Sequence, residues 1–264
     1  MSELFAPTTT SRGGPAADLQ LWALRGLGEI HPGDDLVARL ADVLAAGPGL
    51  RDGDILVVTQ KVVSKAEGRL LDLRTVEPSP FARAWASVHG KDPRHVEAVL
   101  REAQRIVRMD RGVLIAETRH GFICANAGVD ASNVPGDEVV CLLPLDPDAS
   151  AERLRAGLAA RFHAQVGVVI SDTFGRPWRN GQTNVAIGVA GVRALLGYQG
   201  QHDPYGRELR VTEIAVADEL AAAAELVMAK TIGVPAALVR GAATLLGAGS
   251  ARELVRAPEH DLFR

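Results

Sequence analysis

Two short apolar runs, each followed at once by polar residues, constrain the fold of this chain most strongly. Residues 54–60 read DILVVTQ, and residues 166–171 read VGVVIS. Runs of this length and composition predict buried β-strands. The polar segments 61–69 (KVVSKAEGR) and 172–183 (DTFGRPWRNGQT) follow them directly, and we interpret the second as a loop. We therefore expect the chemistry of this chain to lie where its buried strands end.

The remaining segments predict helices mixed with short strands. Helical spacing runs through residues 36–44 and 149–162, and the longest helix is expected within residues 211–230, with Thr212 as its cap. Residues 105–144 predict short antiparallel strands separated by Gly112 and Gly121. The predicted fold class is α+β, mixed helices and strands with antiparallel sheets, and not a plain doubly wound sheet. Residues 1–18 predict a polar N-terminal tail, and residues 19–264 predict a single folded unit.

Composition excludes several functional classes. The chain has 264 residues, with 29 basic and 32 acidic side chains, so its net charge offers nothing to a nucleic-acid backbone. It has no run near the roughly 18 apolar residues of a membrane span, and its first residues do not predict a signal peptide. The two cysteines, Cys124 and Cys141, lie in apolar segments without neighbouring metal ligands. We expect a reduced, cytoplasmic protein without membrane or nucleic-acid partners.

The familiar nucleotide and hydrolase signatures are absent. The chain contains neither G-x-x-x-x-G-K-[ST] nor a G-x-G-x-x-G that follows a strand. It also lacks G-x-S-x-G and H-E-x-x-H, and its seven histidines are scattered. Candidate chemistry is therefore confined to polar segments at the ends of predicted strands.

Two of these segments leave a structural alternative open. In residues 59–68, Lys61 and Lys65 could place ammonium groups over a phosphate, but an exposed lysine pair on a strand edge fits the composition better. In residues 126–133, Asp130 offers oxygens to a hard cation and Asn133 can bind a base or sugar. An Asx-type turn between strands explains that second segment equally well.

The segment 171–183 favours function over a plain surface loop. It carries a carboxylate, several hydroxyls, an amide and the two arginines Arg176 and Arg179 directly after a buried strand. Paired arginines suit a phosphate or carboxylate substrate, and Asp172 with Thr173 suits Mg²⁺ or Mn²⁺. A further segment, residues 203–209 (DPYGREL), has the composition of a β-turn before a helix.

Five segments in collinear order resemble the coenzyme F420-0:L-glutamate ligase family. They are GDILVVTQKVVSKAEGR, NAGVDASNV, SDTFGRPWRNGQTNVAIG, DPYGRELRVTEIAVADELAAAAELVMAK and PAALVRG. The resemblance runs from about residue 19 to residue 264. It implies an enzyme that uses GTP and a divalent cation to join L-glutamate to the lactyl carboxylate of coenzyme F420-0. The divalent cation would be Mg²⁺ or Mn²⁺, and K⁺ is a further candidate. Extension through γ-glutamyl bonds, an acyl-phosphate intermediate and an intertwined, two-lobed homodimer are also implied.

The resemblance also implies roles for individual residues. Nucleotide contacts fall on seven positions: Leu27, Gly28, Glu29, Ile30, Gln60, Lys65 and Asn133. Metal ligands fall on Asp130, Asp172 and Thr173, and the two carboxylates are also expected to be catalytic. We add Arg176 and Arg179 as catalytic candidates that face the acidic substrate or the transferring phosphoryl group. Positioning and charge neutralisation are what phosphoryl transfer requires, so these residue types suit it.

The sequence departs from the family pattern at three places. Gln60 stands where many relatives have Ser, and residues 228–230 are not acidic as they tend to be in archaeal relatives. A second-metal or nucleotide contact at residues 228–230 is therefore in doubt. We also expect a ligase without the reductase-like domain that some relatives carry. Two alternatives stay open: an amide ligase acting on a different carboxylate, and a non-catalytic GTP-binding protein.

Overall fold

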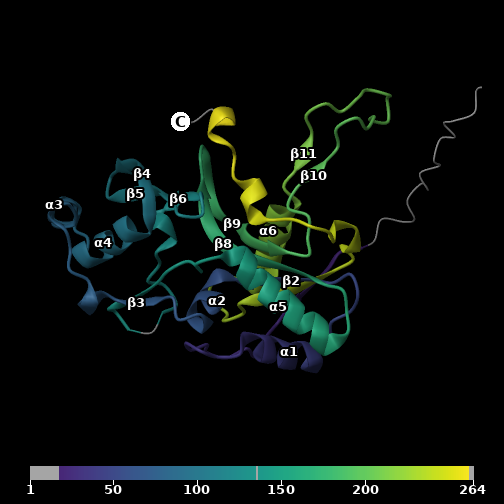
Figure 1. Cartoon of the computed structure of the whole chain (residues 1–264), viewed down its shortest axis with the longest axis horizontal. Helices are drawn as coiled ribbons and strands as arrows, with labels where there is room; N and C mark the ends of the chain where they lie inside the picture. The colour runs from purple at the N-terminus through teal and green to yellow at the C-terminus, as the bar shows by residue number, and fades with distance from the viewer. Residues whose placement is uncertain (1–17, 135, 262–264) are drawn as a thin grey trace, which may run out of the picture.

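The centre of the fold is a five-stranded sheet (Figure 1). The computed structural model describes residues 18–134 and 136–261, so all but the last residue of the predicted tail lies outside the described residues. The strand order is β1 (Gln20–Ala23), β12 (Ala236–Arg240), β2 (Ile55–Thr59), β8 (Gly167–Arg176) and β9 (Arg179–Ala190). Strands β2 and β8 pair in parallel, and the other neighbours pair antiparallel. The mixed α+β class with mainly antiparallel pairing is confirmed.

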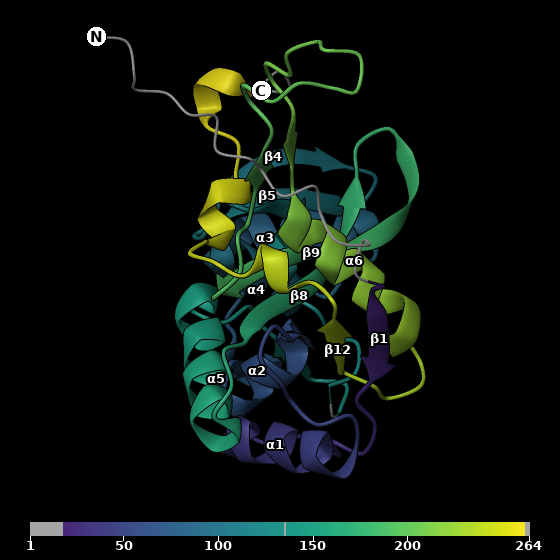
Figure 2. The same cartoon turned by 90° about the vertical axis from the view of Figure 1, so that its right-hand side faces the viewer.

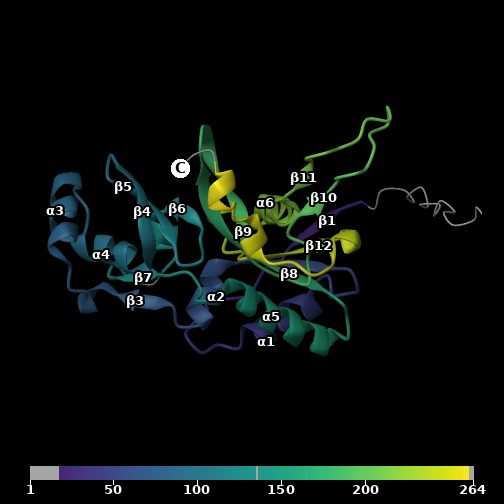
Figure 3. The same ribbon diagram turned by 45° about the horizontal axis from the view of Figure 1, so that its top comes forward.

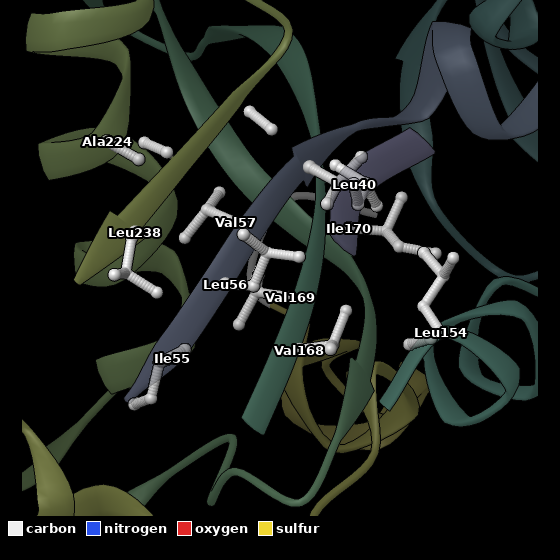
Figure 4. Packing of buried hydrophobic residues seen from close by; sticks show 14 of the residues in the cluster. Leu40, Ile55, Leu56, Val57, Leu154, Val168, Val169, Ile170, Ala224 and Leu238 are labelled. Atoms are coloured by element: carbon white, nitrogen blue, oxygen red, sulfur yellow. The ribbon is translucent and has the colours of Figure 1, made fainter. Parts of the chain in front are cut away.

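Helices cover both faces of this sheet, which is why β2 and the first half of β8 are almost entirely apolar. Helix α1 (Leu36–Ala46) packs against α5 (Pro147–Phe162), and α5 packs across β8 and β9. Helix α6 (Val216–Met228) packs against β9, β12 and β1. In the core, Leu40 and Leu154 lie on one side of the strands and Ala224 of α6 lies on the other (Figure 4).

Residues 70–141 form a smaller group of elements with a hydrophobic cluster of their own. The group contains α3 (Pro80–His89), α4 (Pro93–Glu102) and a three-stranded antiparallel sheet of β4 (Ala103–Asp110), β5 (Val113–Thr118) and β6 (Ile123–Ala125). Strands β3 (Leu70–Asp72) and β7 (Val139–Cys141) pair where the chain enters and leaves the group. The short 3-10 helices η1 (Leu73–Thr75) and η2 (Asn126–Gly128) complete it. These elements lie to one side of the central sheet in Figures 1 and 3.

Two further regions complete the described chain. Strands β10 (Leu196–Gly197) and β11 (Glu213–Ile214) form an arm that extends away from the sheet (Figure 2). At its end, residues 203–209 form the predicted turn, with the Asp203 carboxylate accepting from the backbone of Tyr205 and Arg207. This turn leads to β11 and not directly to a helix. After β12 come three 3-10 helices, η3 (Ala243–Leu245), η4 (Ala251–Leu254) and η5 (Pro258–His260).

Three sequence predictions about elements are wrong. The predicted loop 172–183 is a β-hairpin, because β8 continues to Arg176 and β9 begins at Arg179. Helix α6 begins at Val216 and not near Thr212, since Glu213 and Ile214 pair with β10. The longest helix among the described residues is α5, with 16 residues against 13 for α6. In each case strand pairing, which a local pattern does not reveal, decides the boundary.

Candidate active site

The parallel pairing of β2 and β8 brings the two main polar segments together. Thr59, the last residue of β2, lies opposite Ser171, so β2 ends where β8 continues into the hairpin with β9. Directly after Thr59 the chain enters helix α2 (Gln60–Ala66), which carries Lys61 and Lys65. Directly after Ser171 come Asp172 and Thr173. Ligands of mixed and parallel sheets bind at such strand ends.

A cavity of about 660 Å³ lies where β2 ends. Its walls are the end of β2, the adjoining part of β8, the start of α2, the end of α6 and three loop segments around residues 28–29, 133–134 and 229–235. The volume falls in the range of small-molecule and cofactor sites. Seven of the predicted site residues line it: Gly28, Glu29, Gln60, Lys65, Asn133, Asp172 and Thr173.

Both lysines of α2 are held by carboxylates from distant parts of the chain. The Nζ atom of Lys65 lies 2.5 Å from Oε1 of Glu29, and that of Lys61 lies 2.6 Å from Oδ2 of Asp130. The side chains of Lys61 and Lys65 are 14% and 8% exposed. The strand-edge interpretation of this lysine pair is therefore wrong: a helix begins at once and turns both ammonium groups into the cavity wall.

Asp130 forms the Asx-type turn and also binds a cavity lysine. Its Oδ1 accepts from the backbone N–H of Ser132 at 2.7 Å, which is the Asx-type turn. Its other oxygen, Oδ2, binds the Lys61 ammonium and the Ser132 hydroxyl. Burial raises the pKa of Asp130, but Lys61 and the Ser132 N–H outweigh it and hold the pKa below its usual value. Asp130 therefore stays charged, and it contacts Lys61 in the first turn of α2.

Asp172 is in a different electrostatic state. Burial, with a smaller contribution from the charge of Asp130, raises the pKa of the Asp172 carboxyl from 3.8 to about 6, although Lys61 and Lys230 both lower it. A carboxylate that burial disfavours is stabilised by any cation that approaches it. The charges of Asp130 and Asp172 interact with each other, and carboxylate oxygens are the ligands that divalent ions such as Mg²⁺ or Mn²⁺ prefer.

The Thr173 hydroxyl belongs to a chain of hydrogen bonds across the hairpin. It donates to Oδ1 of Asn184 at 2.8 Å and accepts from Nζ of Lys230 at 2.7 Å. The Asn184 amide in turn donates to Glu225 of α6 at 3.0 Å. Thr173 and Asn184 face each other because they are paired in the register of β8 and β9.

Two buried polar atoms of the cavity wall have no hydrogen-bond partner among the described residues. They are Nε2 of Gln60 and Oγ of Ser171. Both residues line the cavity and are at most 1% exposed, and Oε1 of Gln60 accepts from Ser64. Buried polar groups are normally paired, so these two atoms mark positions where a polar ligand is expected to bind.

The five other predicted site residues do not line the cavity, and Asp130 contacts it only through Lys61. Leu27 and Ile30 are buried in the hydrophobic core, on either side of the cavity-lining Gly28 and Glu29. Arg176 and Arg179 are exposed at the tip of the hairpin, where Arg176 donates to the backbone oxygen of Asn180. The structure does not bring these arginines to the cavity wall. Among residues 18–134 and 136–261, no three acidic, histidine or cysteine side chains converge to hold a metal ion.

Sequence reasoning did not include several residues that line the cavity. Ser171, Asn184 and Glu225 were not singled out, and Lys230 lies where a contact was in doubt. The loop interpretation of residues 172–183 hid Asn184, whose position follows from the strand register. In that register residues 173–175 pair with residues 182–184, and no local sequence pattern indicates this pairing.

Comparison with known proteins decides the family. A family model described as F420-0:Gamma-glutamyl ligase matches residues 26–241. The chain belongs to this family. The predicted resemblance is confirmed, and with it membership of a family of ligases. The match includes every predicted site residue.

Curated relatives from archaea agree with this assignment. The coenzyme F420:L-glutamate ligase of Methanopyrus kandleri is 48% identical over 89% of this chain and 94% of its own length. The protein of the same name from Methanothermobacter thermautotrophicus is 44% identical over 93% of this chain and 99% of its own length. That from Methanocaldococcus jannaschii is 43% identical over 85% and 90%. Separately, no helix within the described part of the chain has the length and apolar character to cross a membrane.

Proposed function

We propose that this chain joins L-glutamate to the lactyl carboxylate of coenzyme F420-0 and extends the product through γ-glutamyl bonds, with GTP as the energy source. Family membership supports this, as do relatives named coenzyme F420:L-glutamate ligase that match over nearly their whole length. The observation that carries the proposal is the cavity where β2 ends beside β8, which is lined by Lys61, Lys65 and Lys230 together with Asp172.

The proposed reaction has two balanced steps. First, an oxygen of the lactyl carboxylate attacks the γ-phosphorus of GTP, and GDP leaves with the electron pair of the broken P–O bond. Then the amine of glutamate attacks the acyl carbon, phosphate leaves, and the amine loses a proton. Positioning and charge stabilisation dominate such phosphoryl transfers, so the lysines of the cavity supply what the first step needs.

Individual residues of the cavity suit the nucleotide. We assign phosphate contacts to Lys65, whose ammonium is a compact, partly dehydrated charge held in place by Glu29. The backbone at Gly28 and Glu29, together with Gln60 and Asn133, would bind the rest of the nucleotide. Leu27 and Ile30 would act by anchoring this backbone in the core. The unpaired Nε2 of Gln60 supports a polar ligand at this wall.

A divalent cation, Mg²⁺ or Mn²⁺, would be held by Asp130 and Asp172. The donor type fits, because both groups are carboxylates and burial leaves Asp172 in need of a positive neighbour, and the cation would take the place of Lys61 at Oδ2 of Asp130. When bound, such a cation neutralises phosphate oxygens. The third predicted ligand, Thr173, fits less well, since its hydroxyl already binds Lys230 and Asn184. K⁺ stays a proposal that rests on the resemblance alone.

Three further features belong to the same proposal. Arg176 and Arg179 would meet the acidic substrate only if it extends to the hairpin tip, or if a second copy supplies a site there. We also propose the two-lobed organisation, with residues 70–141 as the smaller part, and assembly as a homodimer. A cytoplasmic location is supported by Cys124 and Cys141, which are both buried and free.

Product analysis tests the proposal and its alternatives. Purified protein is incubated with coenzyme F420-0, GTP, Mg²⁺ or Mn²⁺ and glutamate, and the products are identified by mass spectrometry. We expect a glutamyl adduct and GDP, and one ¹⁸O atom from a labelled lactyl carboxylate in the released phosphate. Turnover only with a different carboxylate would favour another amide ligase. Tight GTP binding without turnover on any acid would favour a non-catalytic protein.

A further inference from the structure

Three of the four lysines of this chain line the cavity, but one of them is bound differently from the others. Lys61 and Lys65 each lie within 2.6 Å of a carboxylate oxygen. Lys230 instead donates to the neutral hydroxyl of Thr173, and forms no ion pair with any carboxylate within residues 18–134 and 136–261. An ammonium without a direct carboxylate partner is available to an anion, and Lys230 reaches Asp172 only at longer range, where it lowers the pKa of that carboxyl.

The position of this ammonium is built into the fold. Lys230 follows the end of α6, after Ala229, which has a φ of +48° and turns the chain sharply out of the helix. A non-glycine residue rarely adopts this conformation outside functional sites and turns. Thr173 donates a hydrogen bond to Asn184, its cross-strand partner. The Asn184 amide in turn donates to Glu225 of α6. Both ends of the contact are thus anchored on α6 and the hairpin.

The same contact argues against a divalent ion at Thr173. Its hydroxyl proton is donated to Asn184, and one lone pair accepts from Lys230. A metal ion on the remaining lone pair would lie within a few ångströms of the ammonium, where two positive charges repel strongly. Neither Asn184 nor Thr173 carries a charge to compensate. A lysine and a metal ion therefore compete for this hydroxyl.

We propose that the ammonium of Lys230 replaces a second divalent cation in this cavity, and that it binds the phosphate chain of the nucleotide beside Thr173. The site then works with one divalent ion, held by Asp130 and Asp172, and one protein-borne cation. This inference rests on the proposed function for the nucleotide, and goes beyond it in assigning Lys230 and the number of metal ions.

Nucleotide affinity gives the first test. A non-hydrolysable GTP analogue is titrated calorimetrically with Mg²⁺ into wild type, Lys230→Met, Lys230→Arg and the matched control Lys91→Met, whose lysine lies outside the cavity. We expect Lys230→Met to weaken binding at least tenfold, and Lys230→Arg to restore most of the affinity. Lys91→Met should bind as wild type does. Equal affinity of folded Lys230→Met and wild type, with melting curves as the check on folding, would overturn the inference.

Counting Mn²⁺ gives the second test. Electron paramagnetic resonance of free Mn²⁺ measures how many ions bind per chain in the presence of one equivalent of the analogue. We expect one ion in wild type and two in Lys230→Glu, where a carboxylate replaces the ammonium. Two ions in wild type, or one in both proteins, would contradict the inference. A wild type that binds neither analogue nor Mn²⁺ would instead contradict the proposed function itself.

Discussion

At the residue scale, the site depends on charged side chains whose partners come from segments far away in the sequence. Lys65 is 8% exposed and paired to Glu29, which lies 36 positions earlier in the chain. Asp172 lies in β8, whereas Asp130 follows η2 in an isolated bridge to Cys141, and the two differ in the direction of their pKa shifts. Sequence patterns indicated these residue types as candidates, but only the fold determines which carboxylate stays charged and which resists ionisation.

Replacing Lys65 tests the nucleotide assignment. Lys65→Ala removes a charge-assisted hydrogen bond to phosphate, which should cost roughly 1.5–3 kcal/mol of binding free energy, or about 10- to 100-fold in affinity. Stability should change less, because the released Glu29 is half exposed and can be hydrated. Calorimetric titration with a GTP analogue measures the first effect and thermal melting the second. Unchanged affinity in a folded variant would remove Lys65 from the site.

The raised pKa of Asp172 predicts a pH-dependent cost to metal-free stability. Because burial raises this pKa from 3.8 to about 6, the cost is absent below about pH 4, grows up to pH 6 and is complete above it. It amounts to at most about 3 kcal/mol. In chelator at pH 7.5, Asp172→Asn should therefore melt no lower than wild type, and this advantage should shrink towards pH 4.5. A variant that melts lower at pH 7.5 would contradict the assignment.

At the scale of elements, the site exists because β2 and β8 are parallel neighbours. The sequence indicated both strands and the polar residues after them, and this part of the fold was predictable from apolar runs of strand length. The pairing of these strands was not predictable, because they are separated by more than a hundred residues. The β8–β9 hairpin was missed for a related reason: its outer half is exposed, so its side chains lack the apolar pattern of a core strand.

Close packing of β9 on α5 predicts a cost for enlarging one glycine. A Cβ atom on Gly188 would lie 2.4 Å from the backbone oxygen of Pro147 at the start of α5. Gly188→Ala should therefore destabilise the fold by about 1–3 kcal/mol. Gly175→Ala, in β8, is the matched control, because no atom lies within 4 Å of its added Cβ. Denaturant unfolding compares the two; equal stabilities would show that the sheet and helix can move apart freely.

At the scale of the whole molecule, family membership and fold class were predictable, but the surface that would form a homodimer was not. The small residues Ala221 and Ala224 of α6 are fully buried in the chain's own core and cannot form a helix interface with a second copy. The exposed apolar side chains lie elsewhere, with Tyr205 and Val211 on the β10–β11 arm and Leu226 on the outer side of α6. Helical periodicity showed that small residues share one face of α6, but it did not show what that face packs against.

We still expect a homodimer, and these exposed side chains are the candidates for its interface. Light scattering at micromolar concentration should give twice the 27.9 kDa mass of one chain. The double variant Tyr205→Ser/Val211→Ser should shift the equilibrium toward one chain, since it removes apolar area from a contact surface without touching the core. A wild type that scatters as a single chain would count against the dimer.

Cation-dependent product formation tests the central claim that the carboxylates of Asp130 and Asp172 build the ligase site. The glutamyl product of coenzyme F420-0 is measured for wild type, Asp130→Asn and Asp172→Asn across a titration of Mg²⁺ or Mn²⁺. Each substitution keeps the shape of the side chain and removes one charge. We predict that wild type forms the product. At limiting cation concentration, both variants should form it more slowly than wild type by orders of magnitude. Near-normal rates in both variants, with intact melting curves, would contradict the account.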